Sequence, residues 1–302
     1  MITSEVEGMR GSDFLDICDL SPQGLRALLD LSRDLKSGKV RPRPLAGRSI
    51  ALLFQKPSMR TRVSFEVGIE RLGGTSIVLG DAEVGVGRRE PAGDVAGVLA
   101  RYVDGIVARL FDHKDLLEMA RASNKPVINA LTDKSHPCQV LADLMTMDEA
   151  LGGLDRNFKV AFVGDGNNVV YSLIEAHLSL GFQLAVVSPP AYRPAPELLA
   201  RAPGVQLSGD LEAVRGADVV YTDVWTSMGR ESEAAERRAQ FEPYRVDAAL
   251  MARAPGARFM HCLPAHRGEE VEAEVLDGPN SLVLDQAENR LWAQMALLAA
   301  IF

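Results

Sequence analysis

A basic turn between residues 56 and 62 carries groups that could hold a phosphate-sized anion. It follows an apolar run at 50–54, and Pro57 ends the strand that this run predicts. Ser58 is placed to cap the next helix, whose first N–H groups lack intrahelical partners and lie at the positive end of the helix dipole. The cations and hydroxyls on this turn are Lys56, Ser58, Arg60, Thr61 and Arg62. The turn therefore predicts an anion site, with an ordinary capped helix and solvated arginines as the alternative.

Two further segments place polar side chains at the ends of predicted elements. In the run His-Pro-Cys-Gln at 136–139, proline suits the first helical position, which puts His136 at the cap and Gln139 one turn in. Plain helix capping explains both residues as well. Arg109 ends an apolar strand at 105–109, where it is either a surface residue or an anion ligand.

A glycine-containing turn at 164–168, Gly-Asp-Gly-Asn-Asn, follows a predicted strand and opens a helix. A nicotinamide-binding turn is disfavoured, because the third glycine of that motif would fall at Val169 and the next strand ends without an acidic residue. The turn still lies at the carboxyl end of a strand, where ligands of parallel sheets bind. For Asp165 and Asn167, a tight turn of small polar residues is the alternative interpretation.

Two loops in the second half carry carboxylate, hydroxyl and thiol groups. Asp223 follows a strand at 219–222, where its carboxylate could bind the α-ammonium of an amino acid. A second loop, 261–268, begins His-Cys-Leu-Pro and suggests either a metal or a nucleophilic thiol at Cys262. The other cysteines lie in separate segments without paired spacing, and no base for thiol chemistry can be assigned, so we expect no metal and no covalent catalysis.

Strands and helices alternate along most of the chain and predict how these residues are positioned. Strands are expected at 50–54, 76–79, 105–109, 127–129, 159–163, 183–187, 219–222, 259–262 and 282–284. Such alternation favours an α/β protein with two doubly wound parallel-sheet domains. A long amphipathic segment at 137–151 is expected to connect them, which gives domains at 1–136 and 137–285 followed by a terminal helix at 286–302.

The composition excludes several classes of protein. The 302 residues suit two domains, and 47% apolar with 25% charged residues is typical of a globular protein. A net charge of −8 argues against a nucleic-acid partner. Three cysteines, no signal-peptide pattern and no run long enough to span a bilayer predict a cytoplasmic protein without a membrane partner.

These motifs resemble, in order and over nearly the whole chain, those of the aspartate and ornithine carbamoyltransferase family. The turn at 58–62 is similar to its Ser-Thr-Arg-Thr-Arg signature, and residues 136–139 to a transcarbamoylase fingerprint. Residues 223–229 match the Asp-x-x-x-Ser-Met-Gly loop, and His-Cys-Leu-Pro at 261–264 matches the ornithine branch. The arginine-ended strand at 105–109 and Glu-Asn-Arg at 288–290 complete the resemblance, which implies that the terminal helix packs on the first domain.

The resemblance also implies roles for individual residues. Carbamoyl phosphate would be bound by Ser58, Met59, Arg60, Thr61, Arg109, His136, Gln139 and Arg290. L-Ornithine would be bound by Asn168, Asp223, Ser227, Met228, Cys262 and Leu263. The catalytic set would be Arg60, Arg109, His136, Asp223 and Cys262. His136 would donate to the carbamoyl carbonyl oxygen and Gln139 would hold the carbamoyl NH₂ group.

The reaction implied is carbamoyl transfer to the δ-amine of ornithine, giving citrulline and phosphate in arginine metabolism, with no cofactor. The family also implies a homotrimer or a multiple of trimers. A sister enzyme acting on acetylornithine or putrescine is the nearest alternative, which Met59 favours and the Ser-Met-Gly loop disfavours. A dinucleotide-dependent oxidoreductase and a non-catalytic protein that retains the binding fold are alternatives of other classes.

The loop at 80–90 departs from the family. Its members commonly place here a Gln that reaches a neighbouring subunit's carbamoyl phosphate, whereas this chain has Gly85 or, in a shifted alignment, Glu83. Arg88 or Arg89 could replace that contact, and solvated arginines are the alternative.

Overall fold

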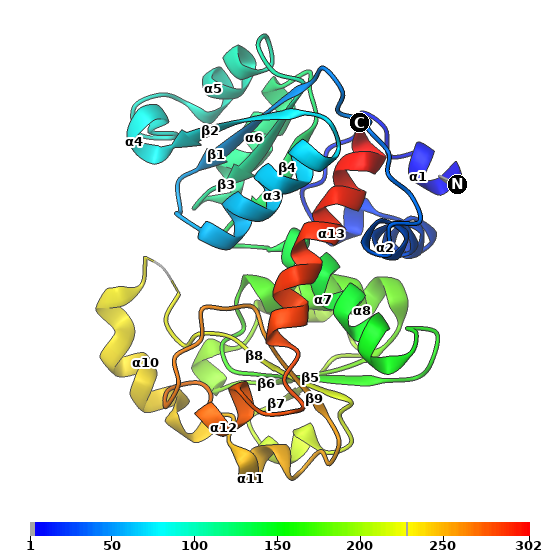
Figure 1. The fold of residues 1–302 in the computed structure, drawn as a ribbon. Coiled ribbons are helices and arrows are strands. Elements are labelled where there is room, and N and C mark those ends of the chain that lie inside the picture. Colours follow the sequence, from blue (N-terminus) through cyan, green and yellow to red (C-terminus); the bar gives the residue numbers. More distant parts are fainter. Residues whose placement is uncertain (1–3, 228) are drawn as a thin grey trace. The chain divides into compact units, whose positions relative to one another are not determined.

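The computed structural model describes residues 4–227 and 229–302, which form two compact units (Figure 1). The first contains the chain up to Met145 together with Glu288–Phe302, and the second is Thr146–Ala287. Both changes of unit fall inside helices, α7 (Pro137–Leu151) and α13 (Val283–Ile301). The predicted boundaries 1–136, 137–285 and 286–302 stay a proposal.

The first unit is built on a four-stranded parallel sheet in the order β2-β1-β3-β4. Its strands are β1 (Ser49–Phe54), β2 (Thr75–Gly80), β3 (Gly105–Arg109) and β4 (Val127–Leu131). Phe54 at the end of β1 pairs with Arg109 at the end of β3. Because parallel strands end at the same edge of a sheet, this register brings the turn after β1 beside Arg109.

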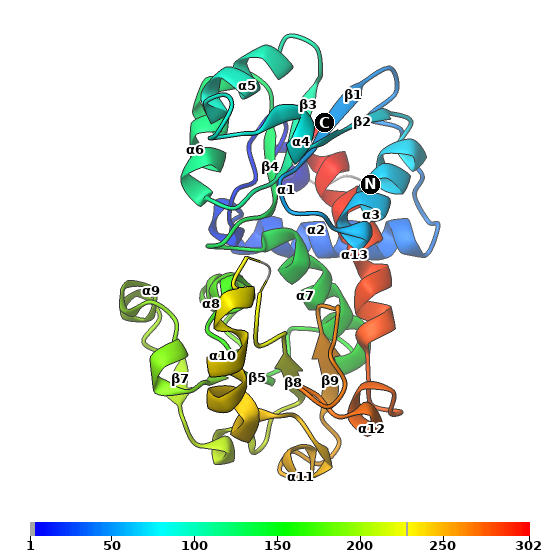
Figure 2. The same cartoon turned by 90° about the vertical axis from the view of Figure 1, so that its left-hand side faces the viewer.

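Helices cover both faces of this sheet. They are α1 (Ser4–Glu7), α2 (Pro22–Lys36), α3 (Met59–Arg71), α4 (Asp81–Val84), α5 (Ala92–Leu99) and α6 (His113–Ala122). Alternate residues of β1 and β3, such as Leu53 and Ile106, pack against buried side chains of α5 and α6. Figure 2 shows these two helices on one side of the sheet, with α3 and α13 on the other.

The C-terminal helix packs on the first unit, as the resemblance implied. A Cβ atom at Gly105 would lie 2.3 Å from the Phe302 ring, and one at Gly68 would lie 3.1 Å from the Met295 side chain. These two glycines therefore allow α13 and the chain end to lie against β3 and α3.

The second unit has a five-stranded parallel sheet in the order β7-β6-β5-β8-β9. Its strands are β5 (Lys159–Val163), β6 (Gln183–Val187), β7 (Gln206–Ser208), β8 (Val219–Thr222) and β9 (Arg258–His261). Val163 pairs with Thr222, and Thr222 pairs with His261. The turn at 164–168, Asp223 and Cys262 therefore follow three neighbouring strand ends.

Helices and the remaining buried side chains complete this second unit. The helices are α8 (Asn168–Leu180), α9 (Pro196–Arg201), α10 (Ala234–Phe241), α11 (Ala248–Met251) and α12 (Ala273–Leu276). Short 3₁₀ turns connect them, including one at Pro190–Tyr192. Leu250 and Val275 pack against alternate residues of the central strands.

The predicted α/β fold of two parallel sheets is confirmed, but one predicted strand is wrong. Residues 282–284 do not form a strand, because Ser281 makes only an isolated bridge to Phe259 and α13 begins at Val283. The Gln286 N–H already donates to the Leu282 carbonyl at 2.8 Å. A three-residue apolar run fits a short strand and a helix start equally well, so its periodicity could not decide. Among the described helices, none is long and apolar enough to cross a membrane.

Candidate active site

The turn after β1 has the geometry that its sequence predicts for an anion site. Ser58 is the N-cap of α3, and its Oγ accepts from the Thr61 N–H at 3.2 Å. The same hydroxyl donates to Thr61 Oγ1 at 3.1 Å. Arg60 lies half-buried on the first turn of α3, while the Met59 side chain is 71% exposed. The helix start therefore offers backbone N–H groups and a nearby guanidinium to an anion.

Arg290 joins this turn to α7 within the first unit. Its Nη2 donates to Thr61 Oγ1 at 2.9 Å and its Nη1 donates to Gln139 Oε1 at 2.5 Å. The other end of the Gln139 amide donates to Asp143 Oδ1 at 2.8 Å. An amide oxygen has two lone pairs, so Gln139 can accept one more hydrogen bond while Arg290 holds it.

Arg109 and Lys56 bring further positive charge to the same edge of the sheet. Arg109 is buried, and its Nε donates to the Lys56 carbonyl oxygen at 3.2 Å. The Lys56 ammonium pairs with Asp133 and lies 4.6 Å from the centre of the Phe111 ring. Buried cations at a parallel-sheet edge attract an anion such as phosphate and repel a cation.

His136 is held neutral in this positive environment. Burial, together with the charges of Arg290, Arg109 and Lys56, lowers the pKa of the His136 imidazole well below its usual 6.5. A neutral imidazole carries one N–H donor and one acceptor nitrogen. His136 can therefore donate a hydrogen bond to a carbonyl oxygen without adding charge.

The 80–90 loop folds on itself within the first unit. The Gly80 N–H donates to Glu83 Oε2 at 2.7 Å at the start of the short helix α4. Arg88 pairs with Asp81, and Arg89 Nη1 donates to the Glu83 carbonyl oxygen at 3.2 Å. The Arg88 side chain remains 70% exposed despite its partner. Both arginines thus have partners inside the loop.

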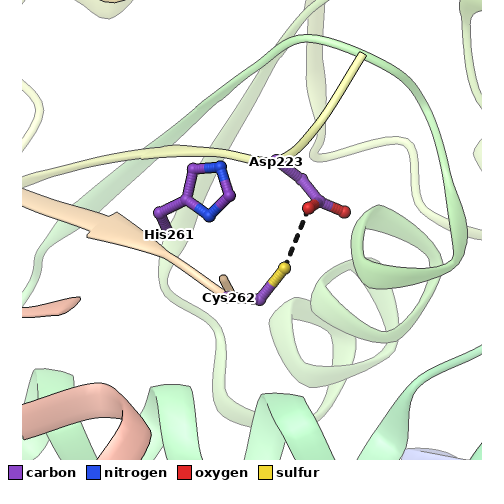
Figure 3. Close-up of side chains that lie close together, drawn as sticks. All are labelled: Asp223, His261 and Cys262. Atoms are coloured by element: carbon purple, nitrogen blue, oxygen red, sulfur yellow. Dashed lines mark hydrogen bonds between the residues drawn. The ribbon is translucent and has the colours of Figure 1, made fainter. Parts of the chain in front are cut away.

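In the second unit, Asp223 and Cys262 face each other at the ends of β8 and β9 (Figure 3). The Cys262 thiol donates to Asp223 Oδ1 at 2.9 Å, and the Val224 N–H donates to the same oxygen at 2.8 Å. Asn167 donates through its amide to Asp223 Oδ2 at 2.7 Å. Asp223 is only 8% exposed. The three donors fix the orientation of its carboxylate.

His261 holds the loop that follows β9. Its Nδ1 accepts from the Leu263 N–H at 2.8 Å, so its other nitrogen carries the proton that faces Glu270 Oε1 at 3.1 Å. Burial acts to raise the pKa of the Glu270 carboxyl, but hydrogen bonds from His261 and from the His266 N–H outweigh it, so that pKa lies below its ordinary value. Leu263 has a positive φ of 53°. The buried pair thus supports a strained turn next to Cys262.

Two further predicted ornithine ligands, Asn168 and Ser227, belong to the segments that follow β5 and β8. Asn168 is the first residue of α8 and is half-buried. Ser227 is also half-buried, and its carbonyl oxygen accepts from the Arg230 N–H at 3.1 Å. Met228 lies outside the described residues.

A metal is one further possibility for this part of the second unit. Ligand-type atoms of Asp223, His261 and Cys262 lie within 4.8 Å of one another. The hydrogen bonds described above already engage both His261 nitrogens and the Cys262 thiol. We keep the sequence prediction of no metal as an expectation, because this arrangement is satisfied as a hydrogen-bonded cluster.

Sequence reasoning assigned no function to Asn167, Glu270 or Arg237. Asn167 caps α8, with its Oδ1 accepting from the Val169 N–H at 3.0 Å, while its amide reaches Asp223. An asparagine at a cap position is a common structural signal, and nothing local distinguishes a cap that also orients a carboxylate. Glu270 is found through its contact with His261, nine residues earlier, and Arg237 through its contact with Asp165, 72 residues earlier.

The fold and these groups define a class of protein before any comparison. One parallel-sheet unit carries positively charged side chains suited to an anion, and the other carries a carboxylate and a thiol at its strand ends. This is the class of two-unit α/β proteins whose ligand-binding side chains follow the carboxyl ends of parallel strands.

Comparison with known proteins gives the family. Residues 12–149 match the carbamoyl-P binding domain of aspartate/ornithine carbamoyltransferase, and residues 156–301 match its Asp/Orn binding domain. The chain belongs to the aspartate/ornithine carbamoyltransferase family.

Individual relatives are similar over nearly their whole length. Ornithine carbamoyltransferase from Methanothermobacter thermautotrophicus is 49% identical, covering 94% of this chain and 96% of that protein. The Bacillus subtilis enzyme of the same name is 47% identical, covering 100% and 97%. The solved structure of ornithine carbamoyltransferase from Pyrococcus furiosus has a TM-score of 0.92 at 46% identity, covering 97% of each chain.

Proposed function

We propose that this protein transfers the carbamoyl group of carbamoyl phosphate to the δ-amine of L-ornithine, giving L-citrulline and phosphate. The observation that carries this proposal is the pairing of Asp223 with the Cys262 thiol at the end of the second sheet. It stands in a chain whose relatives at 47–49% identity are named ornithine carbamoyltransferases. A carboxylate next to a thiol suits a substrate with two amino groups, whereas an aspartate side chain would meet like charge there.

The first unit is proposed to bind carbamoyl phosphate. The start of α3 with Ser58, Met59, Arg60 and Thr61 would hold the phosphate through backbone N–H groups, hydroxyls and the Arg60 guanidinium. Neutral His136 would donate to the carbonyl oxygen, where negative charge develops during attack. Arg109 and Arg290 would stabilise the same charge, and Gln139 would accept from the carbamoyl NH₂ group. Preorganised donors of this kind each contribute roughly 3–4 kcal/mol to transition-state stabilisation.

The second unit is proposed to bind ornithine. Asp223 would pair with the α-ammonium, and Asn168 with Ser227 and Met228 would contact the amino-acid end of the substrate. Cys262 and the Leu263 backbone would receive the side-chain amine. Two side-chain donors, Asn167 and Cys262, and the Val224 N–H keep the Asp223 carboxylate oriented.

The chemical step follows from these placements. The uncharged δ-amine attacks the carbonyl carbon, forming a C–N bond and a tetrahedral intermediate whose oxygen takes the negative charge. The C–O bond to phosphate then breaks, and the amine loses one proton as phosphate leaves with the electron pair. Asp223 and Cys262 are proposed to orient the amine and to help remove its proton.

Assembly and location are part of the proposal. We infer a homotrimer or a multiple of trimers in the cytoplasm, in which Arg88 or Arg89 of one subunit reaches the carbamoyl phosphate of its neighbour. Supporting this, Arg88 is 70% exposed although it pairs with Asp81. We expect Arg88→Ala or Arg89→Ala to raise KM for carbamoyl phosphate. Wild-type kinetics in both variants, or full activity of a stable monomer, would contradict this contact.

Product formation from several amines tests the proposed reaction. The protein is supplied with carbamoyl phosphate and, separately, with ornithine, N-acetylornithine, putrescine or aspartate. We expect citrulline from ornithine and little product from the others, because N-acetylornithine lacks the α-ammonium for Asp223, aspartate lacks the δ-amine, and putrescine lacks the α-carboxylate. Faster product formation from N-acetylornithine or putrescine than from ornithine would transfer the assignment to the sister enzymes.

A further inference from the structure

A charged arginine side chain lies almost fully buried in the second unit, outside the set of proposed substrate ligands. Arg237, on α10, is 1% exposed. Its Nη1 donates to Asp165 Oδ2 at 2.9 Å and to the Trp225 carbonyl oxygen at 2.8 Å, and its Nε donates to Glu233 Oε2 at 3.0 Å. A guanidinium removed from water this completely needs such partners to offset its desolvation.

Aromatic rings enclose the same guanidinium. Its carbon lies 4.8 Å from the centre of the Tyr192 ring and 5.9 Å from the centre of the Phe241 ring. The Trp225 ring stacks on the Phe241 ring, with centroids 6.2 Å apart and an angle of 19° between the ring planes. Arg237 therefore has one arrangement in which the planar group, its acceptors and the rings all fit.

The partners of Arg237 belong to the two segments that place the proposed ornithine ligands. Asp165 lies two residues before Asn167, whose amide donates to Asp223 Oδ2. Trp225 lies two residues after Asp223 and two before Ser227. One guanidinium thus joins the turn after β5 to the loop after β8, which are 72 and 12 residues away from it in sequence.

Asp165 depends on this contact. Burial raises the pKa of the Asp165 carboxyl even though Arg237 acts in the opposite direction. Removing the arginine would leave a buried carboxyl without its cation, and the turn would have to rearrange or take up a proton.

We propose that Arg237 is a positioning residue for the amino-acid substrate, which fixes loop residues 223–227 against the turn at 164–168. This inference rests on the proposed function, because it assigns the positioned site to ornithine. A purely structural role would lower stability and affect both substrates alike, whereas a positioning role affects ornithine selectively.

Arg237→Lys tests the proposal because it keeps the positive charge but loses the planar fork that reaches Asp165, Trp225 and Glu233 together. Arg238→Lys is the matched control, since Arg238 lies on the same helix, is 63% exposed and pairs only with Glu269 among its described ion pairs. We expect Arg237→Lys to raise KM for ornithine by about 10-fold while KM for carbamoyl phosphate changes by less than about 2-fold. The control should change neither constant.

A second readout does not depend on turnover. The chain has two tryptophans, so a Trp292→Phe background leaves Trp225 as the only fluorescent indole. In that background, Arg237→Lys should shift the emission of Trp225 to longer wavelength, because the loop loses its anchor and admits water, and Arg238→Lys should not. If wild-type protein makes no citrulline, the proposed function fails, while this emission shift still tests the anchoring.

Several outcomes would overturn the inference. These are an unchanged ornithine KM in folded Arg237→Lys, an equal rise in both KM values, or the same emission as the control. If Arg237→Lys does not fold, as judged by circular dichroism, Asp165→Asn replaces it, since this variant retains an oxygen acceptor and removes only the charge. An unchanged ornithine KM in Asp165→Asn, or failure of both variants to fold, would then reduce Arg237 to a structural residue.

Discussion

The guanidinium of Arg290 donates to the side-chain oxygen of Gln139 at 2.5 Å, joining two residues 151 positions apart in the chain. The same group reaches Thr61 Oγ1 at 2.9 Å through its other terminal nitrogen. The C-terminal helix thus fixes side chains of α3 and α7, the two helices whose first turns are proposed to hold carbamoyl phosphate. We therefore propose that Arg290 acts on that substrate both by its charge and by holding Gln139 and Thr61 in place.

Replacing Arg290 with lysine keeps the positive charge and should therefore show what the hydrogen bonds to Gln139 and Thr61 contribute. A single ammonium cannot reach Gln139 and Thr61 at once, because it lacks the fork of the guanidinium. We expect Arg290→Lys to lower kcat/KM for carbamoyl phosphate by at least about 100-fold, as for the loss of a preorganised transition-state donor. Steady-state kinetics at saturating ornithine give the value. A folded variant with near-normal kcat/KM would show that Arg290 has only a structural role and does not act on carbamoyl phosphate.

The neutral state of His136 predicts how stability depends on pH. The pKa of this imidazole is lowered by burial and by Arg290, Arg109 and Lys56, whereas the unfolded chain takes up the proton near pH 6.5. Below that pH the unfolded state binds more protons than the folded state, so the free energy of unfolding falls as pH falls toward the lowered pKa. Above pH 6.5 both states are neutral, and His136 adds no slope.

Urea denaturation between about pH 8 and about pH 5 measures this slope. His113 contributes in the same direction, since burial and Lys134 lower its pKa as well. A His136→Asn variant is therefore the reference, and its stability should fall less steeply in acid than that of the wild type. Parallel curves for the two proteins would mean that His136 is protonated in the folded state.

Local patterns predicted the elements and the cap, whereas side-chain contacts between distant segments could not be predicted. Ser58 and the apolar run before it specify a strand and a capped helix through nearest neighbours alone, and the structure has both. The sequence leaves Asn167 open between a ligand-binding turn and a structural turn, because its contact with Asp223 joins positions 56 residues apart. Arg237 has only the local pattern of a surface arginine on a short polar helix, whereas its burial depends on contacts with the segments of Asp165, Trp225 and Tyr192.

The error at residues 282–284 has the same origin. Val283 is buried and Leu284 is 77% exposed, so the run has one side inside and one side in water, as either a strand or a helix would give. Gln286 favours the helix, because its side chain accepts from the His261 N–H at 2.9 Å and donates to the Tyr221 hydroxyl at 3.0 Å. Such a tertiary contact leaves no periodic signal in the sequence.

The three cysteines should differ sharply in their reaction with iodoacetamide. Burial raises the pKa of the Cys138 thiol to about 12, so almost no reactive thiolate exists there at neutral pH. Cys18 is exposed and should react whether or not substrate is present, which makes it the internal control. Cys262 is half-buried beside Asp223, and we expect ornithine to protect it.

Mass spectrometry of peptides gives the labelling rate of each thiol in one experiment. Ornithine together with carbamoyl phosphate should slow the labelling of Cys262 by about 10-fold or more, since a bound amine covers its sulfur. N-Acetylornithine should protect much less at equal concentration. Labelling of Cys262 that ignores ornithine would remove this thiol from the proposed amine site.

Met59 departs from the family pattern in the turn at 58–62, where the signature has threonine, and one substitution restores that residue. It lies at the start of α3 between Ser58 and Arg60, and its side chain is 71% exposed, so a smaller residue leaves no cavity. Met59→Thr would add a hydroxyl donor to a bound phosphate, and a hydrogen bond to a charged group contributes about 1.5–3 kcal/mol. We therefore expect KM for carbamoyl phosphate to fall by about 10-fold or more, with KM for ornithine unchanged.

Met59→Val is the matched control, because valine has the shape of threonine without the donor. If the threonine and valine variants have the same KM for carbamoyl phosphate, the side chain at this position does not contact the phosphate and only its backbone N–H contributes.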